Sequence, residues 1–396
     1  MRPKIAVVRG HYYSREELTF YRPLQDNFDI TFFSSVRGSA STGAGVPVVE
    51  LPCLDGLLNS VSLGLFGKVF GLAGNLAGID LEIVFGLKDR LRGFDIVYSV
   101  DYDYLLTYYL SRLKARLGFK LAAIHWENIP FARDGRPVAR FFKYRTYRSI
   151  DSFFAMSERA KASLLLEGVE ERRIYVTNYG VDTDRFKPDP EAGRIWRKRF
   201  GLSENDLVIL FVGRVRASKG VFELIYAAKR LVSDPEIDRK RLKVVIVGRG
   251  PRENEASGMI NRLGLKENVL QIGYIPHGEM HNAHNMADLF CLPSLPRKFW
   301  QEQLGQVFLE AMSCGKPVVS TMSGSIPEVI GDAGILVQPN DHLALYEGLK
   351  KAITDKGFRK SMSLKGLDRV SNHFSAGVIS SNLKRAYEEV MNSDAR

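Results

Sequence analysis

Residues 207–232, LVILFVGRVRASKGVFELIYAAKRLV, combine a strand pattern with a helix pattern. Six apolar residues are followed by a loop that contains glycine, and apolar residues then recur at helical spacing. This order predicts one strand–loop–helix unit of a parallel sheet. The start of such a helix attracts anions, and Arg214 and Lys219 add two positive charges there. A planar guanidinium beside a compact ammonium group suits a diphosphate, whereas the plainer interpretation is two bases on a surface loop.

The same alternation of strand and helix patterns runs through most of the chain. The predicted strands are Lys4–Val8, Asp29–Phe33, Val46–Leu51, Asp95–Ser99, Lys120–Ile124, Ser152–Ala155, Leu207–Val212, Lys243–Val247, Val269–Ile272, Leu289–Leu292, Pro317–Ser320 and Ile335–Val337. Helical patterns are typical of residues 15–25 and 368–391. The stretch YGVDTDRFKPDP (179–190) is typical of a linker. We therefore expect an α/β protein with two doubly wound domains, 1–185 and 186–370, and a terminal helix within 371–396 that crosses back to the first domain.

The composition is that of an ordinary globular protein. The chain has 396 residues, of which 45% are hydrophobic and 26% are charged. Its three cysteines, Cys53, Cys291 and Cys314, are far apart, which indicates free thiols in a reducing compartment. The beginning, MRPKIAVVRG, lacks a signal-peptide pattern. We expect a cytoplasmic protein.

The positive charge is concentrated in one window. The net charge is +11, and residues 112–148 contain ten Lys or Arg against two acidic residues. This window suits phosphates, an anionic membrane surface or nucleic acid, and a solvated helix face is an equal alternative. Nearby, glycines at 64, 67, 71, 74 and 78 share one face of a predicted helix over 57–79. That helix packs on its own sheet or faces a membrane or acceptor.

Two further motifs in the second half point to a ligand. The strand VVIVG (244–248) runs into Arg249 and Gly250, a turn that lets a nucleotide approach the backbone. Glu302 and Glu310 bracket seven residues, and a helix between them would separate the two carboxylates by about 12 Å. That distance is too long for an acid–base pair, but it suits contacts with two hydroxyl-bearing parts of one ligand.

In these stretches the chain resembles the retaining glycosyltransferases of family 4, which have the GT-B fold. The resemblance rests on NYGVDTDRFKP (178–188), FVGRVRASKG (211–220), VVIVGRGP (244–251), IGYIPHGEM (272–280), ADLFCLPS (287–294), EAMSCGKPVVST (310–321), GSIPEVI (324–330) and the Glu302–Glu310 spacing. It is looser in the first half, at FDIVYSVD (94–101), the strand ending in His125, and AMSERAKASLLLEGV (155–169). It implies two Rossmann-like domains that face a central cleft.

The resemblance also implies roles for individual residues. Arg214 and Lys219 would neutralise the donor diphosphate, Glu310 would bind the ribose, and Glu302 would hold the transferred sugar. His125 would lie near the anomeric carbon and the acceptor, although a lone histidine at a strand end is more often structural. The remaining donor-binding candidates are glycine turns and loop backbone: Gly10, Gly213, Gly248, Gly250, Tyr274, Ile275, Gln303, Leu304 and Gly305.

The chain departs from the family pattern at three places. A glycine pair after the first strand is replaced by Arg9-Gly10-His11, an aromatic residue by Leu304, and a later glycine pair by Gly324-Ser325. The first and third departures affect donor or acceptor detail, and the second affects packing near the sugar. None of them removes Arg214 or Lys219.

Two groups have metal-ligand spacing. Asp101-Tyr102-Asp103 matches the metal-binding pair of a different transferase fold, and His277, His281 and His284 have a spacing seen in zinc sites. The aspartate pair follows a first-domain strand, and the other transferase fold lacks the second half of this chain. The histidine stretch resembles a family stretch that has no metal role. We therefore expect no metal and no cofactor.

The function implied is transfer of a hexosyl group from a UDP- or GDP-sugar to a hydroxyl of a glycan or lipid-linked acceptor, with retention and without metal. The product would belong to lipid-linked glycan, glycolipid or polysaccharide synthesis, made in the cytoplasm at the inner face of a membrane. Alternatives are a sugar-nucleotide epimerase of the same fold and a non-catalytic nucleotide-sugar-binding protein. Nucleic acid is disfavoured as a partner, because carboxylates in the site repel its phosphates.

Overall fold

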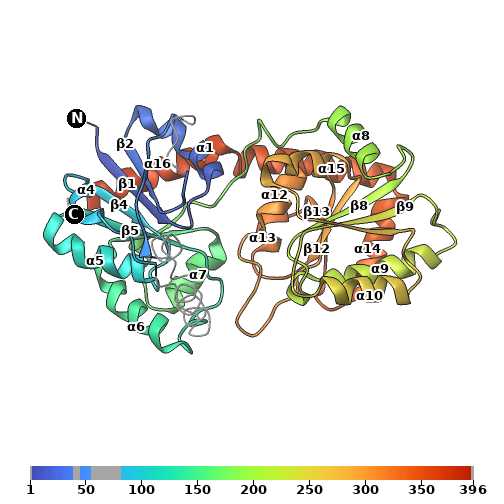
Figure 1. Cartoon of the computed structure of the whole chain (residues 1–396), viewed down its shortest axis with the longest axis horizontal. Coiled ribbons are helices and arrows are strands. Elements are labelled where there is room, and N and C mark those ends of the chain that lie inside the picture. Colours follow the sequence, from blue (N-terminus) through green and yellow to red (C-terminus); the bar gives the residue numbers. More distant parts are fainter. Residues whose placement is uncertain (1, 39–44, 55–81, 394–396) are drawn as a thin grey trace, which may run out of the picture. The chain divides into compact units, whose positions relative to one another are not determined.

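The computed structural model describes residues 2–38, 45–54 and 82–393, and the chain divides into two compact units (Figure 1). The first contains Met1–Asn178 together with Ala376–Arg396, and the second is Tyr179–Ser375. The predicted glycine-faced helix over 57–79 lies outside the described residues. No described helix combines the length and the apolar character needed to cross a membrane.

The first unit is built on a seven-stranded sheet in the order β3-β2-β1-β4-β5-β6-β7, with all paired strands parallel. Its strands are β1 Lys4–Gly10, β2 Asp29–Ser34, β3 Val48–Glu50, β4 Ile96–Ser99, β5 Lys120–His125, β6 Ser152–Ala155 and β7 Ile174–Val176. The helices among its described residues are α1 Leu18–Tyr21, α4 Leu87–Arg90, α5 Leu105–Leu117, α6 Pro137–Thr146, α7 Glu158–Leu166 and α16 Ala376–Asn392. The apolar residues of the central strands are fully buried, as expected for a parallel sheet covered on both faces.

The terminal helix α16 packs against the first unit through aromatic and polar contacts. Tyr387 is fully buried, and its ring lies 6.1 Å from that of Tyr98 on β4. At the carboxyl end of the helix, the Lys120 Nζ donates to the backbone oxygens of Val390 (2.8 Å) and Met391 (3.1 Å). A cation at this position satisfies helix carbonyls that have no partner within the helix.

The second unit has six parallel strands in the order β10-β9-β8-β11-β12-β13. They are β8 Leu207–Val212, β9 Leu242–Val247, β10 Val269–Gly273, β11 Leu289–Leu292, β12 Val318–Thr321 and β13 Gly334–Val337. The helices are α8 Pro190–Arg199, α9 Val221–Ser233, α10 Glu253–Arg262, α11 Met280–Asn285, α12 Gln306–Ser313, α13 Ile326–Ile330, α14 His342–Thr354 and α15 Lys356–His373. Both units therefore have the doubly wound α/β architecture that the sequence predicts.

All twelve predicted strands are present, with ends that differ by at most two residues. β7 was not predicted. The helix expected over 15–25 is three short turns, Arg15–Glu17, Leu18–Tyr21 and Arg22–Asp26, and the helix expected over 368–391 is interrupted between α15 and α16. The units meet at 178/179 and 375/376 rather than at the expected 185/186 and 370/371. The Val181 amide donates to the Phe374 oxygen (2.9 Å), so the segments that enter and leave the second unit run side by side.

Candidate functional site

The strand order of the second unit reverses direction between β8 and β11. In open parallel sheets, ligands bind outside the carboxyl ends of the strands at such a point. The loop after β8 carries Gly213, Arg214 and Lys219, and the loop after β11 carries Ser294 and Glu302. Residues that are about 80 positions apart in the sequence thus reach the same edge of the sheet.

Lys219 and Glu302 form an ion pair at this edge. The Lys219 Nζ lies 2.9 Å from Glu302 Oε1 and 2.7 Å from Oε2, and the Ser294 hydroxyl donates to Oε2 at 2.7 Å. The Trp300 ring flanks the ammonium group, with its centroid 4.9 Å from Nζ. Glu302 and Ser294 are buried, while the Lys219 side chain retains 19% exposure. A charged, partly accessible ammonium group is therefore held beside a buried carboxylate.

The predicted donor-binding glycines Gly248 and Gly250 lie against backbone. A Cβ on Gly248 would lie 2.0 Å from the Gly213 oxygen, and one on Gly250 would lie 2.3 Å from the Val215 oxygen. The loops after β8 and β9 can pack this closely only without side chains. Packing between the loops thus accounts for both glycines, whether or not a ligand contacts them.

The separation of about 12 Å between the Glu302 and Glu310 carboxylates assumed a helix from residue 302 to residue 310. That assumption was wrong, because Glu302 precedes α12. The helix begins at Gln306, after Gly305 at φ +78°, and residues 302–305 form a loop. The Glu302 oxygen accepts from the Ser325 amide at 2.9 Å. A Cβ on Gly324 would lie 2.0 Å from the same oxygen. The Gly324-Ser325 turn therefore supports the backbone that presents Glu302.

Glu310, the second carboxylate of the motif, is held by two histidines. Its Oε1 lies 3.0 Å from His277 Nε2, and its Oε2 lies 3.1 Å from His284 Nε2. His284 is fully buried, whereas 34% of the His277 side chain is exposed. Burial raises the pKa of Glu310, but the hydrogen bonds from both histidines outweigh it and leave the pKa at about 2. Glu310 is thus an ionised carboxylate with one accessible neighbour.

The other candidates of the second unit differ in exposure. Arg214 is exposed, and its guanidinium forms no ion pair with a described residue. Tyr274 is 69% exposed, whereas Ile275 and Leu304 are buried. Gln303 is half-buried.

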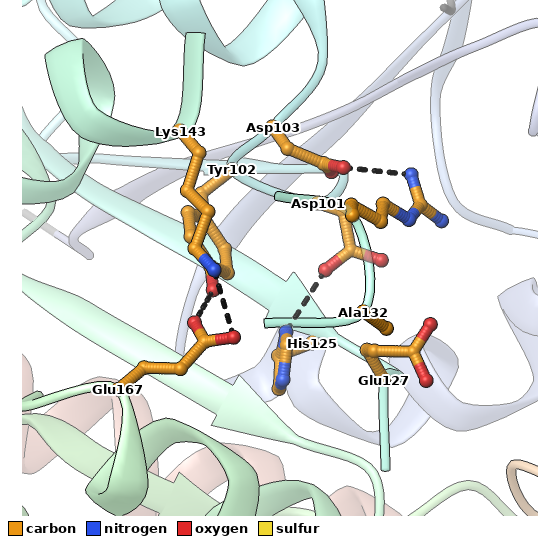
Figure 2. A pocket seen from close by; sticks show the side chains of 9 residues that line it. Asp101, Tyr102, Asp103, His125, Glu127, Ala132, Lys143 and Glu167 are labelled. Atoms are coloured by element: carbon orange, nitrogen blue, oxygen red, sulfur yellow. Dashed lines mark hydrogen bonds and ion pairs between the residues drawn. The ribbon is translucent and has the colours of Figure 1, made fainter. Parts of the chain in front are cut away.

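In the first unit, His125 ends β5 and lines a small cavity (Figure 2). Its Nδ1 lies 3.1 Å from Asp101 Oδ1, and both side chains are buried. Asp103, two residues further along, pairs with Arg133 at 2.8 Å. Burial raises the pKa of Asp103 to about 6, against the opposing effect of Arg133. The two aspartates therefore contact different partners.

Gly10, the last residue of β1 in the first unit, has φ +56°, and a Cβ there would lie 2.0 Å from Glu82 Oε2. Glu82 accepts from the His11 amide at 2.8 Å. The preceding residue, Arg9, is buried and pairs with Glu17 at 2.8 Å. Arg9 and Gly10 thus have structural partners, and Gly10 and His125 lie in a different unit from the remaining candidates.

The three histidines at 277, 281 and 284 do not converge on one point: two contact Glu310, and His281 does not. Among residues 2–38, 45–54 and 82–393, no group of three or more His, Cys, Asp or Glu side chains is arranged to hold a metal ion.

The basic window divides into structural and exposed residues. Lys114, Lys120, Arg133 and Lys143 all have partners within the first unit. Lys143 is buried and contacts Glu167 at 2.8 Å and Asp134 at 2.9 Å. The exposed members are Arg112, Arg116, Arg136, Arg140, Arg145 and Arg148.

Comparison with protein families gives the second unit its identity. Residues 194–369 match the model of the glycosyl transferases group 1 family. The chain carries a group 1 glycosyltransferase domain. One relative is from Mycolicibacterium smegmatis and is named GDP-mannose-dependent alpha-(1-6)-phosphatidylinositol monomannoside mannosyltransferase. It is 36% identical over 193 residues, which is 47% of this chain and 49% of that protein. The alpha-D-kanosaminyltransferase of Streptomyces kanamyceticus is 26% identical over 265 residues, 66% of each chain.

Solved structures extend this likeness to the whole fold. HepE from Anabaena, in complex with UDP and glucose, matches with a TM-score of 0.76 and 18% identity over 98% of this chain and all of that one. WaaG, a glycosyltransferase involved in lipopolysaccharide biosynthesis, matches with a TM-score of 0.62 and 18% identity, covering 96% of this chain and 98% of that one. The glycosyltransferase domain and the preceding unit thus form the GT-B fold. The chain spans about half the length of the first of its curated relatives.

Sequence reasoning missed several contacts of the glycosyltransferase domain. Ser294 and Trp300 contact the Lys219–Glu302 pair, and His277 and His284 hold Glu310. The histidine spacing was a signal, but it was weighed as a zinc pattern rather than as a pair of donors to a carboxylate. Ser294 and Trp300 lie in a loop without a periodic pattern.

Proposed function

We propose that the chain transfers a hexosyl group from a nucleotide-sugar to an acceptor hydroxyl, with retention of anomeric configuration. The observation that carries the proposal is the Lys219–Glu302–Ser294 cluster at the reversal of strand order, inside a group 1 glycosyltransferase domain. A diphosphate is the leaving group of such a donor, and cations fixed at its position stabilise the charge that develops as the bond to the sugar breaks.

Each group at the edge has a task in this reaction. Lys219 turns from Glu302 toward the diphosphate, where Arg214 and the amino end of α9 add positive charge. Glu302 is then available to accept hydrogen bonds from hydroxyls of the sugar. Glu310 accepts from the ribose hydroxyls in the place of His277, its exposed neighbour. The exposed Tyr274 ring offers a surface to the base, and the donor-binding glycines let the nucleotide approach the backbone.

The donor in this proposal is a UDP- or GDP-sugar. One relative is named for GDP-mannose, and one structural neighbour was solved with UDP. No metal takes part, because Arg214 and Lys219 meet the leaving charge. The acceptor proton passes to the leaving phosphate, and no carboxylate is assigned as a nucleophile.

The acceptor is a glycan or lipid-linked hydroxyl, and an anionic membrane surface is the second partner that we propose. Helix α6 turns Val138, Phe141 and Tyr144 outward, with exposed fractions of 38%, 46% and 54%. Arg140 and Arg145 are exposed on the same helix, and the Arg145 guanidinium lies 5.1 Å from the Phe141 ring centroid. Aromatic and cationic side chains together suit the headgroup region of an anionic bilayer. The chain then acts in the cytoplasm, at the inner face of the membrane.

Two assays on the full chain test the proposed function. The first is a thermal-shift screen over UDP-, GDP- and ADP-sugars, in which a ligand bound by the folded chain raises the melting temperature. The second follows a labelled donor with and without lipid extract. Transfer of label to an acceptor supports the proposal, whereas release of nucleotide without acceptor supports the epimerase. Binding without turnover supports a non-catalytic binding protein.

A further inference from the structure

The cavity beside His125 contains a histidine nitrogen with no described partner. His125 Nε2 is completely buried and makes no hydrogen bond within the described part of the chain. The cavity, formed where β4 and β5 end, has a volume of about 20 Å³, which is enough for a water or a substrate hydroxyl. Buried polar atoms without partners are rare in folded proteins. We therefore expect this nitrogen to bind a ligand atom or to have another functional role.

Asp101 determines which hydrogen-bonding role this nitrogen has. An ionised carboxylate can only accept hydrogen bonds, so the 3.1 Å contact with Asp101 Oδ1 places the proton on His125 Nδ1. In a neutral imidazole, the other nitrogen then carries a lone pair and acts as an acceptor. Nε2 is thus prepared to accept a hydrogen bond from a hydroxyl that enters the cavity.

The neighbouring carboxylates have other partners. Asp103 accepts from Arg133, and Glu127 Oε1 accepts from the amides of Asn128 and Ile129. Glu167 contacts Lys143 and the Tyr102 hydroxyl on the far side of the cavity (Figure 2). Asp101 is therefore the cavity carboxylate that contacts His125. Asp103, the other aspartate of the Asp101-Tyr102-Asp103 sequence, offers a matched control.

We propose that Asp101 is a positioning residue that holds His125 in the tautomer protonated at Nδ1, so that Nε2 accepts a hydrogen bond from a substrate hydroxyl. The identity of that hydroxyl, on the acceptor or on the transferred sugar, rests on the proposed function. The assignment gives Asp101 a role through His125, and it gives Asp103 a separate structural role through Arg133.

Nitrogen NMR of the full chain labelled with ¹⁵N-histidine tests the tautomer without any substrate. We expect the neutral imidazole of His125 to carry its proton on Nδ1 and not on Nε2, with the signals assigned by their loss in His125→Gln. In Asp101→Asn, the amide group can donate to Nδ1, and the proton moves at least partly to Nε2. Asp103→Asn should leave the His125 signals unchanged. A protonated Nε2 in the unmodified chain, or identical His125 signals in Asp101→Asn, would overturn the proposal.

Kinetics provide the second readout. Asp101→Asn should lower transfer by about tenfold or more, while the affinity for the nucleotide, bound by the other unit, stays within about twofold. Transfer equal to that of the unmodified chain would refute the positioning role. A chain inactive with every donor would refute the proposed transfer, and the tautomer measurement would then decide the role of Asp101.

Discussion

Replacing Glu310 by Gln should remove a large, pH-dependent contribution to the stability of the second unit. The hydrogen bonds from His277 and His284 lower the pKa of Glu310 from 4.5 to about 2. A folded-state pKa below the unfolded value stabilises the fold above pH 4.5, and this stability is lost as the pH falls toward 2. The difference corresponds to about 3 kcal/mol at neutral pH.

Calorimetry of the full chain between pH 7 and pH 3 measures this effect. For a unit of this size, about 3 kcal/mol corresponds to a melting temperature lower by roughly 6–12 °C in Glu310→Gln at pH 7. The gap should shrink to less than half by about pH 3, because the carboxylate of the unfolded chain, with its ordinary pKa of 4.5, is then largely protonated. Glu347→Gln, a change on α14, is the control and should show little gap at either pH. A constant gap for Glu310→Gln across the range would show that Glu310 does not titrate with a lowered pKa in the folded chain.

Three further outcomes follow from the structure. Transfer should survive EDTA, since Arg214 and Lys219 supply the positive charge. A complete loss of transfer activity in EDTA that manganese restores would instead favour metal binding, with Asp101 and Asp103 as the first candidates for ligands. In flotation with anionic liposomes, the unmodified chain should bind at low salt and dissociate as the salt concentration rises. The double variant Arg140→Glu, Arg145→Glu should bind more weakly. An unmodified chain that never floats would refute the membrane contact. Gly220→Ala should destabilise the second unit by more than about 1–2 kcal/mol, because residue 220 has φ +71° and its new Cβ would lie 1.9 Å from the Pro293 oxygen. Gly258→Ala on α10, where a Cβ meets nothing within 4 Å, should be neutral or stabilising in the same denaturation experiment.

The sheets were predictable because each strand carries its own signal. β8 reads as six consecutive apolar residues, and Val208–Phe211 are fully buried. β7 has only three residues, Ile174–Val176, too few for a periodic pattern. The break between α15 and α16 was missed because helical spacing of apolar residues continues on both sides of Phe374.

The site was predictable in its parts but not in its pairings. The strand–loop–helix pattern indicated Lys219, and the spacing of Glu302 and Glu310 indicated Glu302. Their ion pair was not predictable, because it joins residues 83 positions apart. Lys143 shows the same limit: by sequence it belongs to a basic surface, yet it is buried between Glu167 and Asp134. It is therefore not an anion-binding surface residue. Charge counts along a chain do not reveal which charges fold inward against a partner.

The role of Lys219 in the proposed reaction is to stabilise the leaving diphosphate of the nucleotide-sugar. Its most direct test is kcat/KM for transfer from the preferred donor, measured for the unmodified chain, Lys219→Ala and Lys266→Ala. Lys266 is an exposed lysine just before β10, at the amino edge of the same sheet. We expect a loss of more than about tenfold for Lys219→Ala, since a charged hydrogen bond to a leaving group contributes about 1.5–3 kcal/mol, and little change for Lys266→Ala. An unchanged kcat/KM in Lys219→Ala would contradict the assignment.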